Sequence, residues 1–191
     1  MSFVAHLING ISLGSVYALI ALGYTMVYGI AKMLNFAHGD VIMIGGYVVF
    51  VTASGMGLPP LAAIVISMAV CTVLGVTIER VAYRPLRGAS PLAVLITAIG
   101  VSYLLQNVAL LVFGSDTKAF TNVVTMPNLE LFDGQLIIKS VTVVTVIVSI
   151  IIMVGLNLFV KRTKLGRAMT AVSEDKGAAQ LMGINVNGTI A

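Results

Sequence analysis

The sequence predicts an all-α protein, a polytopic bundle of transmembrane helices, and three observations lead to that fold class. Of 191 residues, 59% are hydrophobic and 9% are charged, whereas a soluble domain carries about 25% charged residues. Residues 1–31 and 41–78 contain no Asp, Glu, Lys or Arg. The Lys and Arg residues gather in short polar stretches between apolar runs. A soluble core of this size cannot hide so much apolar surface, so the surrounding solvent is a lipid bilayer.

Five apolar segments follow one another, and we expect each to be a membrane segment. They cover residues 7–30, 41–53, 61–78, 91–113 and 140–160. A helical span needs roughly 17–25 residues, so the first, third, fourth and fifth segments are long enough. The second segment is short. It is either a re-entrant half-helix or a full span that includes part of residues 35–40.

The first segment carries two stripes of residues along one helix. Small residues at a spacing of four let another backbone approach closely, and they are Gly10, Gly14 and Ala18. The second stripe consists of tyrosines, namely Tyr17, Tyr24 and Tyr28. Tyr24 and its neighbour Thr25 either pack within the bundle or line a transport pathway. The segment has no basic start and no small-residue cleavage site, so we expect a retained helix and not a signal peptide.

A polar break separates the first two segments, and it reads Asn35-Phe36-Ala37-His38-Gly39-Asp40. An unpaired polar group costs several kcal/mol in hydrocarbon, so such a cluster indicates a function. We predict that Asn35, Phe36, His38, Gly39 and Asp40 form a hinge or gate of the substrate pathway. A proton relay between His38 and Asp40 is the alternative. It requires a helix broken at Gly39, because residues two apart otherwise lie on different helix faces.

The distribution of charge orients the chain in the membrane. Lys and Arg are enriched in cytoplasmic loops, and here they gather at residues 79–90 and 161–167, whereas residues 114–139 are slightly acidic. We therefore place 79–90 and 161–191 inside and 114–139 outside. If residues 41–53 span the membrane, the N-terminus is outside and residues 32–40 lie near the inner face. If they re-enter, the N-terminus is inside and residues 35–40 lie deeper.

Two amides, Gln106 and Asn107, stand in the second half of the fourth apolar segment. Amides within a membrane tend to hydrogen-bond across helices. We therefore expect these two side chains either to bond a neighbouring helix or to contact a substrate. At the other end of the segment, Pro91 occupies a position that suits the start of a helix.

The cytoplasmic stretch after the last segment predicts a short capped helix over residues 174–182. Ser173 has the form of an N-cap, and Glu174 and Asp175 would complement the helix dipole in the first turn. Gly183 suits the left-handed position that follows a helix, and Ile184 suits the apolar position after it in a Schellman ending.

One face of this predicted helix is apolar and comprises Ala178, Leu181 and Met182. No other part of the sequence is an obvious cover for that face. It either lies on the bilayer or the bundle, or it docks a soluble partner.

Several motifs of enzymes and binding proteins are absent from the sequence. It contains no Gly-x-x-x-x-Gly-Lys-Ser/Thr phosphate loop, so we do not expect the chain to bind ATP, and we predict no catalytic residues and no cofactor. His6 and His38 stand apart and Cys71 is the single cysteine, so we expect neither a metal site nor an internal disulfide. The positive charges behind the net charge of +4 are confined to short loops, which indicates topology and not nucleic-acid binding.

Together these features resemble the permease subunits of ABC importers for branched-chain amino acids, of the high-affinity leucine/isoleucine/valine type. The resemblance rests on residues 9–29, 35–40, 79–85, 98–100, 166–169 and 173–185. It implies a multi-pass transport subunit of the bacterial inner membrane, without enzyme activity of its own. The implied partners are a second homologous permease subunit, two ATP-binding cassette subunits, a periplasmic or extracellular substrate-binding protein and the lipid bilayer.

The resemblance also assigns residues 165–185 as the cytoplasmic loop that docks on the ATP-hydrolysing subunit. The docking residues that it implies are Gly166, Arg167, Ser173, Glu174, Asp175, Ala178, Leu181, Met182 and Gly183. Members of this family carry an acidic residue at the position of Asp40, and they continue with further membrane segments after the docking loop. We therefore expect residues 1–191 to form a single transmembrane permease domain that is partial at its C-terminal end.

Two other functions are compatible with the residues. An ion-coupled secondary transporter or channel also contains broken helices at mid-membrane. A non-transporting fragment would support no uptake even with every partner present. The apolar composition and the resemblance favour leucine, isoleucine or valine as the substrate, whereas related permeases carry urea, amides and other amino acids.

Overall fold

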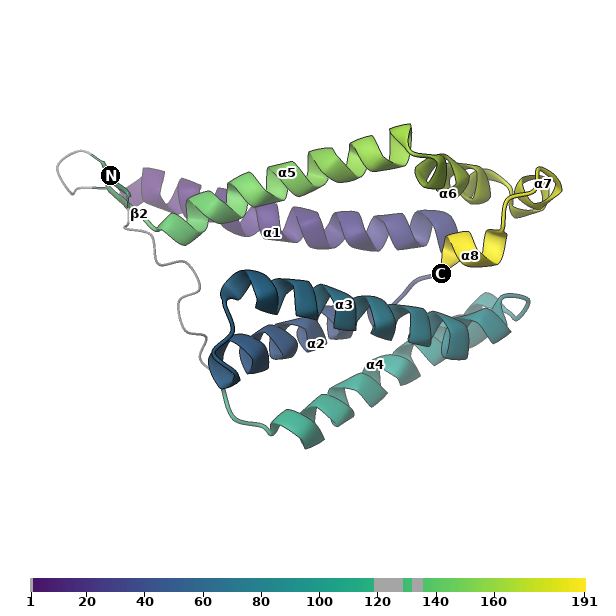
Figure 1. Ribbon diagram of the computed structural model, residues 1–191, viewed down its shortest axis with the longest axis horizontal. Coiled ribbons are helices and arrows are strands. Elements are labelled where there is room, and N and C mark those ends of the chain that lie inside the picture. The colour runs from purple at the N-terminus through teal and green to yellow at the C-terminus, as the bar shows by residue number, and fades with distance from the viewer. Residues whose placement is uncertain (1, 119–128, 132–135) are drawn as a thin grey trace. The chain divides into compact units, whose positions relative to one another are not determined.

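The computed structural model describes residues 2–118, 129–131 and 136–191, which are mostly helical (Figure 1). The all-α fold class is confirmed, with one small addition, a two-stranded ribbon. The chain divides into two compact units, and the boundary falls between Ala31 and Lys32. Unit 1 joins the first 31 residues to residues 124–190, and unit 2 comprises residues 32–123.

Unit 1 is built on two long helices that lie side by side, α1 (Ser2–Ala31) and α5 (Ser140–Arg162). The strand β2 lies near the start of α1, and the helix α6 (Lys164–Glu174) packs on α1 and α5 at the other end. The two long helices therefore run parallel. Two short helices, α7 (Lys176–Leu181) and α8 (Val186–Ile190), follow α6.

The face of α1 that turns toward α5 is not the predicted small-residue stripe. Gly10, Gly14 and Ala18 are exposed, and a Cβ added at either glycine would meet nothing within 4 Å. The half-buried residues of α1 lie on another face, which includes Ser12, Leu19 and Leu22. The helix α5 therefore does not pack on the small-residue stripe, and close packing of another helix there stays a prediction.

A short antiparallel ribbon precedes α5. Its strands are β1 (Leu129–Leu131) and β2 (Leu136–Ile138), with Leu129 opposite Ile138 and Leu131 opposite Leu136. The sequence predicted only a polar loop over residues 114–139. Within that loop, residues 119–128 and 132–135 lie outside the described part of the chain.

The described helices of unit 2 form three continuous helical stretches, which we call rods. The first is α2 (His38–Phe50), which continues as the π-helical turn η1 (Val51–Gly55). The second is α3 (Pro60–Ile78), which continues through the π-helical turn η2 (Glu79–Tyr83) and the 3₁₀ turn η3 (Arg84–Leu86). The third is α4 (Pro91–Phe113), where Ser90 accepts a hydrogen bond from the Ala93 amide and Pro91 begins the helix as predicted.

Small residues let α2 and α3 approach closely. Gly45 is buried on α2, and Ser67 Oγ donates a hydrogen bond to its carbonyl oxygen at 2.9 Å. One turn further along α3, Cys71 Sγ contacts the Val41 carbonyl oxygen at 3.6 Å. Because Val41 meets Cys71 while Gly45 meets Ser67, the two helices run antiparallel. Close approach through small and hydroxyl residues is typical of helix pairs in membranes.

Four of the described helices are long and apolar enough to cross a membrane. They cover His6–Ala31, Pro60–Leu86, Pro91–Phe113 and Ser140–Arg162, which agrees with the first, third, fourth and fifth predicted segments. The second segment is shorter, because α2 and η1 have 13 and 5 residues, or about 27 Å of helix at a rise of ~1.5 Å per residue. Whether this segment spans the membrane or re-enters it stays a prediction with two alternatives.

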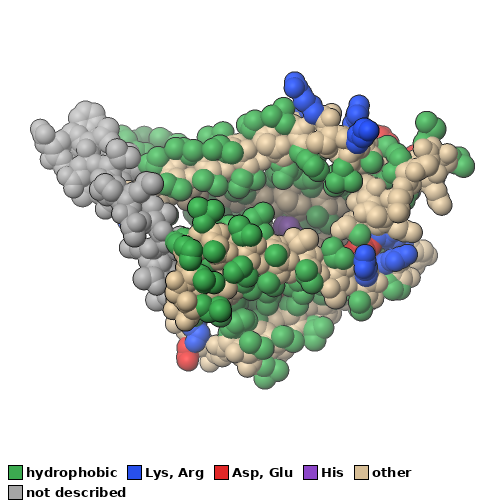
Figure 2. Space-filling model, in the orientation of Figure 1, with side chains coloured by type: hydrophobic (Ala, Val, Ile, Leu, Met, Phe, Trp, Pro, Cys, Tyr) green, Lys and Arg blue, Asp and Glu red, His purple; other side chains and the backbone are tan. Residues whose placement is uncertain are grey.

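The exposed surface of both units is largely apolar (Figure 2). Leu111, for example, has 85% of its surface exposed, and Leu61 has 77%. Such exposure is costly in water, and it is the expected state of side chains that face lipid.

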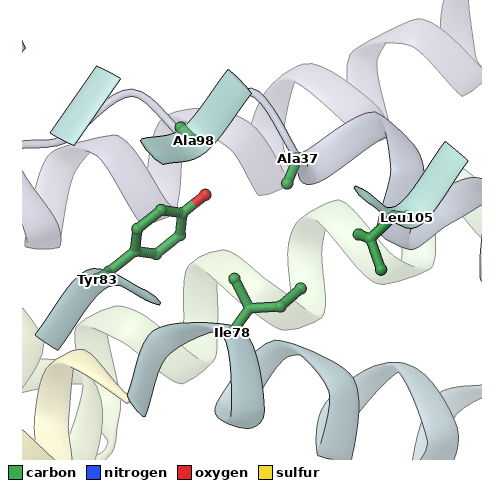
Figure 3. Packing of buried hydrophobic residues seen from close by; sticks show 5 residues of the cluster. All are labelled: Ala37, Ile78, Tyr83, Ala98 and Leu105. Atoms are coloured by element: carbon green, nitrogen blue, oxygen red, sulfur yellow. The ribbon is translucent and has the colours of Figure 1, made fainter. Parts of the chain in front are cut away.

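A cluster of buried hydrophobic residues in unit 2 includes part of the polar break (Figure 3). It comprises Ala37, Ile78, Tyr83, Ala98 and Leu105, which come from the break itself, from the α3–η2 rod and from α4. Ala37 and Ala98 are completely buried. The non-helical residues before α2 are therefore held against two helices through Ala37, and the break is a packed part of the fold.

Candidate functional site

The polar break begins with an unusual backbone conformation. The helix α1 ends at Ala31, and Lys32 follows with φ 56°, the left-handed region that non-glycine residues adopt only at a cost. Among the residues that the structure describes, no other non-glycine residue has a positive φ. The chain then stays non-helical until α2 begins at His38.

Asn35 holds the break by hydrogen bonds in two directions. Its side-chain oxygen accepts from the Ala37 amide at 3.1 Å and from the Tyr83 hydroxyl at 2.7 Å. The first bond fixes the local turn, as Asn side chains commonly do. The second bond ties the break to η2, at the end of the rod that leads into the basic stretch 79–90.

Asp40 pairs with α4. Only 7% of its surface is exposed, and its Oδ1 accepts a hydrogen bond from Gln106 Nε2 at 3.0 Å. Gln106 also donates to Ser102 Oγ at 3.2 Å. The predicted bond between Gln106 and a neighbouring helix is thereby confirmed, whereas Asn107 instead donates to the carbonyl of Tyr103 on its own helix. Asp40 also stands in the first turn of α2, where a carboxylate complements the helix dipole.

The two ends of the break contact different parts of unit 2. Asn35 lies beside Tyr83, near the end of the α3–η3 rod. Asp40 lies beside Gln106, which is about 22 Å beyond Pro91 along α4 at a rise of ~1.5 Å per residue. The placement of residues 32–40 near the inner face stays a prediction.

The remaining residues of the predicted gate differ in exposure. His38 is half-buried, and Phe36 and Gly39 are exposed. The helix α2 is continuous through Gly39, so the helix break that a relay between His38 and Asp40 requires is not present. Tyr24 and Thr25 belong to unit 1 and the break to unit 2, so the two parts of the predicted pathway are described separately.

Thr25 lines a groove between α1 and α5 with a volume of about 540 Å³. The walls are mostly apolar, and the polar side chains among them are Thr25, Asn157 and Lys161. A second hollow, of about 400 Å³, lies in unit 2 beside α2, with Tyr47, Asp116 and Lys118 among its lining residues. Tyr47 stacks on Phe113, with ring centroids 4.2 Å apart. Of the residues predicted to line a pathway, Thr25 lies in the first hollow. The other walls of both hollows could not be predicted from the sequence, because they depend on which helices are neighbours.

The stretch that follows α5 begins with a tight corner. Thr163 Oγ1 caps α6 by accepting a hydrogen bond from the Gly166 amide at 2.9 Å. Gly166 is buried, and a Cβ at this position would overlap the backbone of Phe159 and Val160. Glycine is therefore needed here for the turn between α5 and α6, while Arg167 beside it is exposed.

The helix α7 begins later than predicted, and the predicted N-cap at Ser173 is wrong. Asp175 is the N-cap, and its Oδ1 accepts from the Gly177 and Ala178 amides at 2.7 and 3.0 Å. Ser173 lies inside α6, and its hydroxyl donates to the Thr170 carbonyl at 2.6 Å. The physical reason is that α6 continues through Glu174, so the first residue free to take an extended conformation is Asp175.

The predicted end of this helix is confirmed. Gly183 has φ 81°, and its amide donates to the Gln180 carbonyl at 3.0 Å. The Ile184 amide donates to the Ala179 carbonyl at 3.0 Å. These two bonds define a Schellman ending, in which a left-handed residue lets two carbonyls find partners. Caps at both ends therefore fix this short helix.

The predicted apolar face of α7 is open. Leu181 and Met182 have 90% and 83% of their surfaces exposed, and Ala178 is exposed as well. Ala179, on another face, is buried. In Figure 1, α7 projects at the end of α6. The helix is thus anchored through one face and presents two large apolar side chains on another.

A family model for "Branched-chain amino acid transport system / permease component" matches residues 6–191. The chain belongs to this family. The same residues that carry the polar break and the capped helix α7 fall within the match.

Comparison with individual proteins supports the same family membership. The chain is 43% identical to the high-affinity branched-chain amino acid transport system permease protein BraD of Pseudomonas aeruginosa, over 99% of this chain and 65% of the relative. It is 40% identical to LivH of Escherichia coli, over the same shares of the two chains. A probable LivH of Methanocaldococcus jannaschii is 28% identical over 90% of this chain and 55% of its own length.

The chain thus spans 65% of the length of the relatives BraD and LivH. No solved structure matches it significantly. Together with the four apolar helices, membership of this family identifies a multi-pass protein of the bacterial inner membrane.

Proposed function

We propose that the chain is a membrane-spanning permease subunit of an ABC importer, which translocates branched-chain amino acids with ATP hydrolysed by a separate subunit. The observation that carries the proposal is the capped helix α7, whose large apolar side chains Leu181 and Met182 are exposed next to a basic cytoplasmic stretch. A soluble partner with an apolar groove is the natural cover for such a helix. The relatives named above are permease proteins of transport systems for this class of substrate.

The docking surface that we propose consists of α7 and its caps. Leu181 and Met182 supply the apolar contact, with Ala178 beside them. Asp175 and Gly183 hold the helix ends, and Arg167, Ser173 and Glu174 belong to α6, which carries α7. Gly166 supports the surface from the α5–α6 corner and does not contact the partner itself, because it is buried.

The polar break is the proposed gate. Asn35 and Asp40 tether it to η2 and to α4, so a shift of either rod moves the chain between them. Phe36 is exposed along this stretch, so its side chain is accessible to a substrate pathway. A second homologous permease subunit and a periplasmic or extracellular binding protein complete the proposed importer, with two ATP-binding cassette subunits on the inner side.

The groove between α1 and α5 suits the proposed substrate class. Its walls are apolar, as the side chains of leucine, isoleucine and valine require, and Thr25 and Asn157 offer hydrogen bonds to a polar backbone. This property supports the prediction that Tyr24 and Thr25 belong to the pathway.

The docking proposal is tested by co-purification of the ATP-binding subunit with charged variants of α7. Leu181→Glu and Met182→Glu should abolish co-purification, because they place a carboxylate in an apolar contact. Gln180→Glu is the matched control, since it adds the same charge to an exposed position on another face of the same helix. Unchanged binding by the Leu181 and Met182 variants would refute this docking surface.

A further inference from the structure

We propose that Lys176 is the positioning residue that links the docking helix α7 to the polar break in the membrane. Its Nζ donates a hydrogen bond to the Ala31 carbonyl oxygen at 3.1 Å, across 145 residues of sequence. Ala31 is the last residue of α1, and the non-helical stretch that leads into the break begins at the next residue, Lys32. The inference rests on the proposed function, because it assigns the route by which a partner on α7 would act on the membrane helices.

The end of α1 needs such a partner. The last carbonyls of a helix have no donor within the helix, and the negative end of the helix dipole attracts a cation. The sequence of α1 provides no basic residue in its last turn. Ala31 is also buried, so water has little access to its carbonyl. Lys176 supplies from another helix both the donor and the positive charge that α1 lacks.

The position of Lys176 has no explanation within α7. It is the first residue of that helix, and a cation at a helix N-terminus is opposed by the dipole. A residue that breaks a local rule commonly does so for a function elsewhere in the structure. Here the bond to Ala31 provides that function, because the unfavourable charge at the start of α7 becomes a favourable one at the end of α1.

The bond lies at the junction between α1 and the non-helical stretch that follows it. Lys32 follows Ala31 with φ 56°, a position at which helices usually end with glycine. The boundary between the two compact units lies between these same two residues. Strained backbone persists where surrounding contacts hold it in place. Lys176 is such a contact, and a partner that moves α7 would tighten or release the residue on which the break turns.

The inference separates two roles within one cytoplasmic stretch. Leu181 and Met182 bind the partner, whereas Lys176 transmits the movement of α7 to α1. Loss of Lys176 should therefore leave the ATP-binding subunit attached and reduce the amount of substrate moved for each ATP hydrolysed.

The test uses the complete importer in proteoliposomes, with the full-length permease, its ATP-binding subunits and the binding protein. Labelled leucine uptake, ATP hydrolysis and co-purification are measured for Lys176→Met and Lys176→Arg. The control is Lys164→Met, since Lys164 is also an exposed lysine at the first position of a cytoplasmic helix. We expect all variants to retain the ATP-binding subunit. Lys176→Met alone should lower the ratio of uptake to hydrolysis, and arginine should restore it.

Three results would overturn the inference. They are a wild-type ratio in Lys176→Met, loss of the ATP-binding subunit in that variant, and a defect in Lys176→Arg as large as that in Lys176→Met. If Lys176→Met does not reach the membrane, a cysteine pair from Ala31→Cys and Lys176→Cys decides the question. A short bifunctional reagent should join the pair with a yield that ATP changes, and a yield insensitive to ATP would overturn the inference.

A failure of the proposed function gives a different result. In that case the wild-type importer would show no ATP-driven leucine uptake at all, whatever residue stands at position 176. The cysteine pair then still reports whether Lys176 lies against the end of α1.

Discussion

Gly45 packs α2 onto α3 so closely that we expect Gly45→Ala to destabilise the protein. The added Cβ would lie 2.9 Å from Cys71 Sγ and 3.3 Å from Ser67 Oγ. The first distance is too short for a stable contact, so either Cys71 Sγ must rotate away from the Val41 carbonyl or the two helices must move apart. Overpacking of this kind costs about 1–3 kcal/mol. Gly46→Ala is the matched control, because a Cβ there meets nothing within 4 Å, and alanine favours a helix over glycine by roughly 1 kcal/mol.

The assay is unfolding of the purified protein in mixed micelles by increasing amounts of SDS. Gly45→Ala should be less stable than Gly46→Ala by about 1–3 kcal/mol, since both gain the same helix propensity and only one is overpacked. Adding Cys71→Ala to Gly45→Ala removes the sulfur and should recover most of the loss, because the two substitutions share one contact. Equal stability of the two single variants, or no recovery in the double variant, would refute the close approach of α2 and α3.

Three further predictions concern the N-cap of α7, the corner between α5 and α6, and the buried pair of Asp40 and Gln106. Asp175→Ala removes the N-cap of α7 and should weaken that helix by about 1 kcal/mol, measured as faster proteolysis of residues 170–185, whereas Ser173→Ala should not change the rate. Gly166→Ala should disrupt the α5–α6 corner, because the new methyl group overlaps backbone atoms; circular dichroism and expression in the membrane would show it, and a stable variant would contradict the described turn. Gln106→Leu leaves the buried Asp40 without its donor, so a loss of about 1–3 kcal/mol is expected; the same SDS assay measures it, and no loss would argue against that pairing.

The membrane helices could be predicted from the sequence because the length of an apolar run is counted directly. The helix α4 begins at Pro91 and ends at Phe113 as expected, and Gly183 ends α7 as expected. These features depend on local chemistry, namely a proline at a helix start and a glycine in a left-handed conformation. Local chemistry did not identify the N-cap of α7, because Ser173 and Asp175 can both cap a helix. The length of α6 decides in favour of Asp175.

The contacts that organise the candidate site could not be predicted in the same way. Asn35 and Tyr83 are 48 residues apart, Asp40 and Gln106 are 66 apart, and Lys176 and Ala31 are 145 apart. A pattern of apolar residues indicates which face of a helix is buried, and it does not indicate which helix covers that face. For Gln106 the sequence predicted a hydrogen bond to a neighbouring helix, but it did not identify Asp40 as the partner.

One measurement tests most directly our proposal that the chain belongs to an importer driven by ATP hydrolysis in a separate subunit. Labelled leucine uptake is followed in proteoliposomes that contain the complete importer, with and without internal ATP and with ion gradients dissipated by ionophores. We expect uptake that requires ATP, that survives the loss of the gradients and that disappears with Leu181→Glu and Met182→Glu but not with Gln180→Glu. Uptake that persists without ATP and collapses with the ion gradients would contradict it.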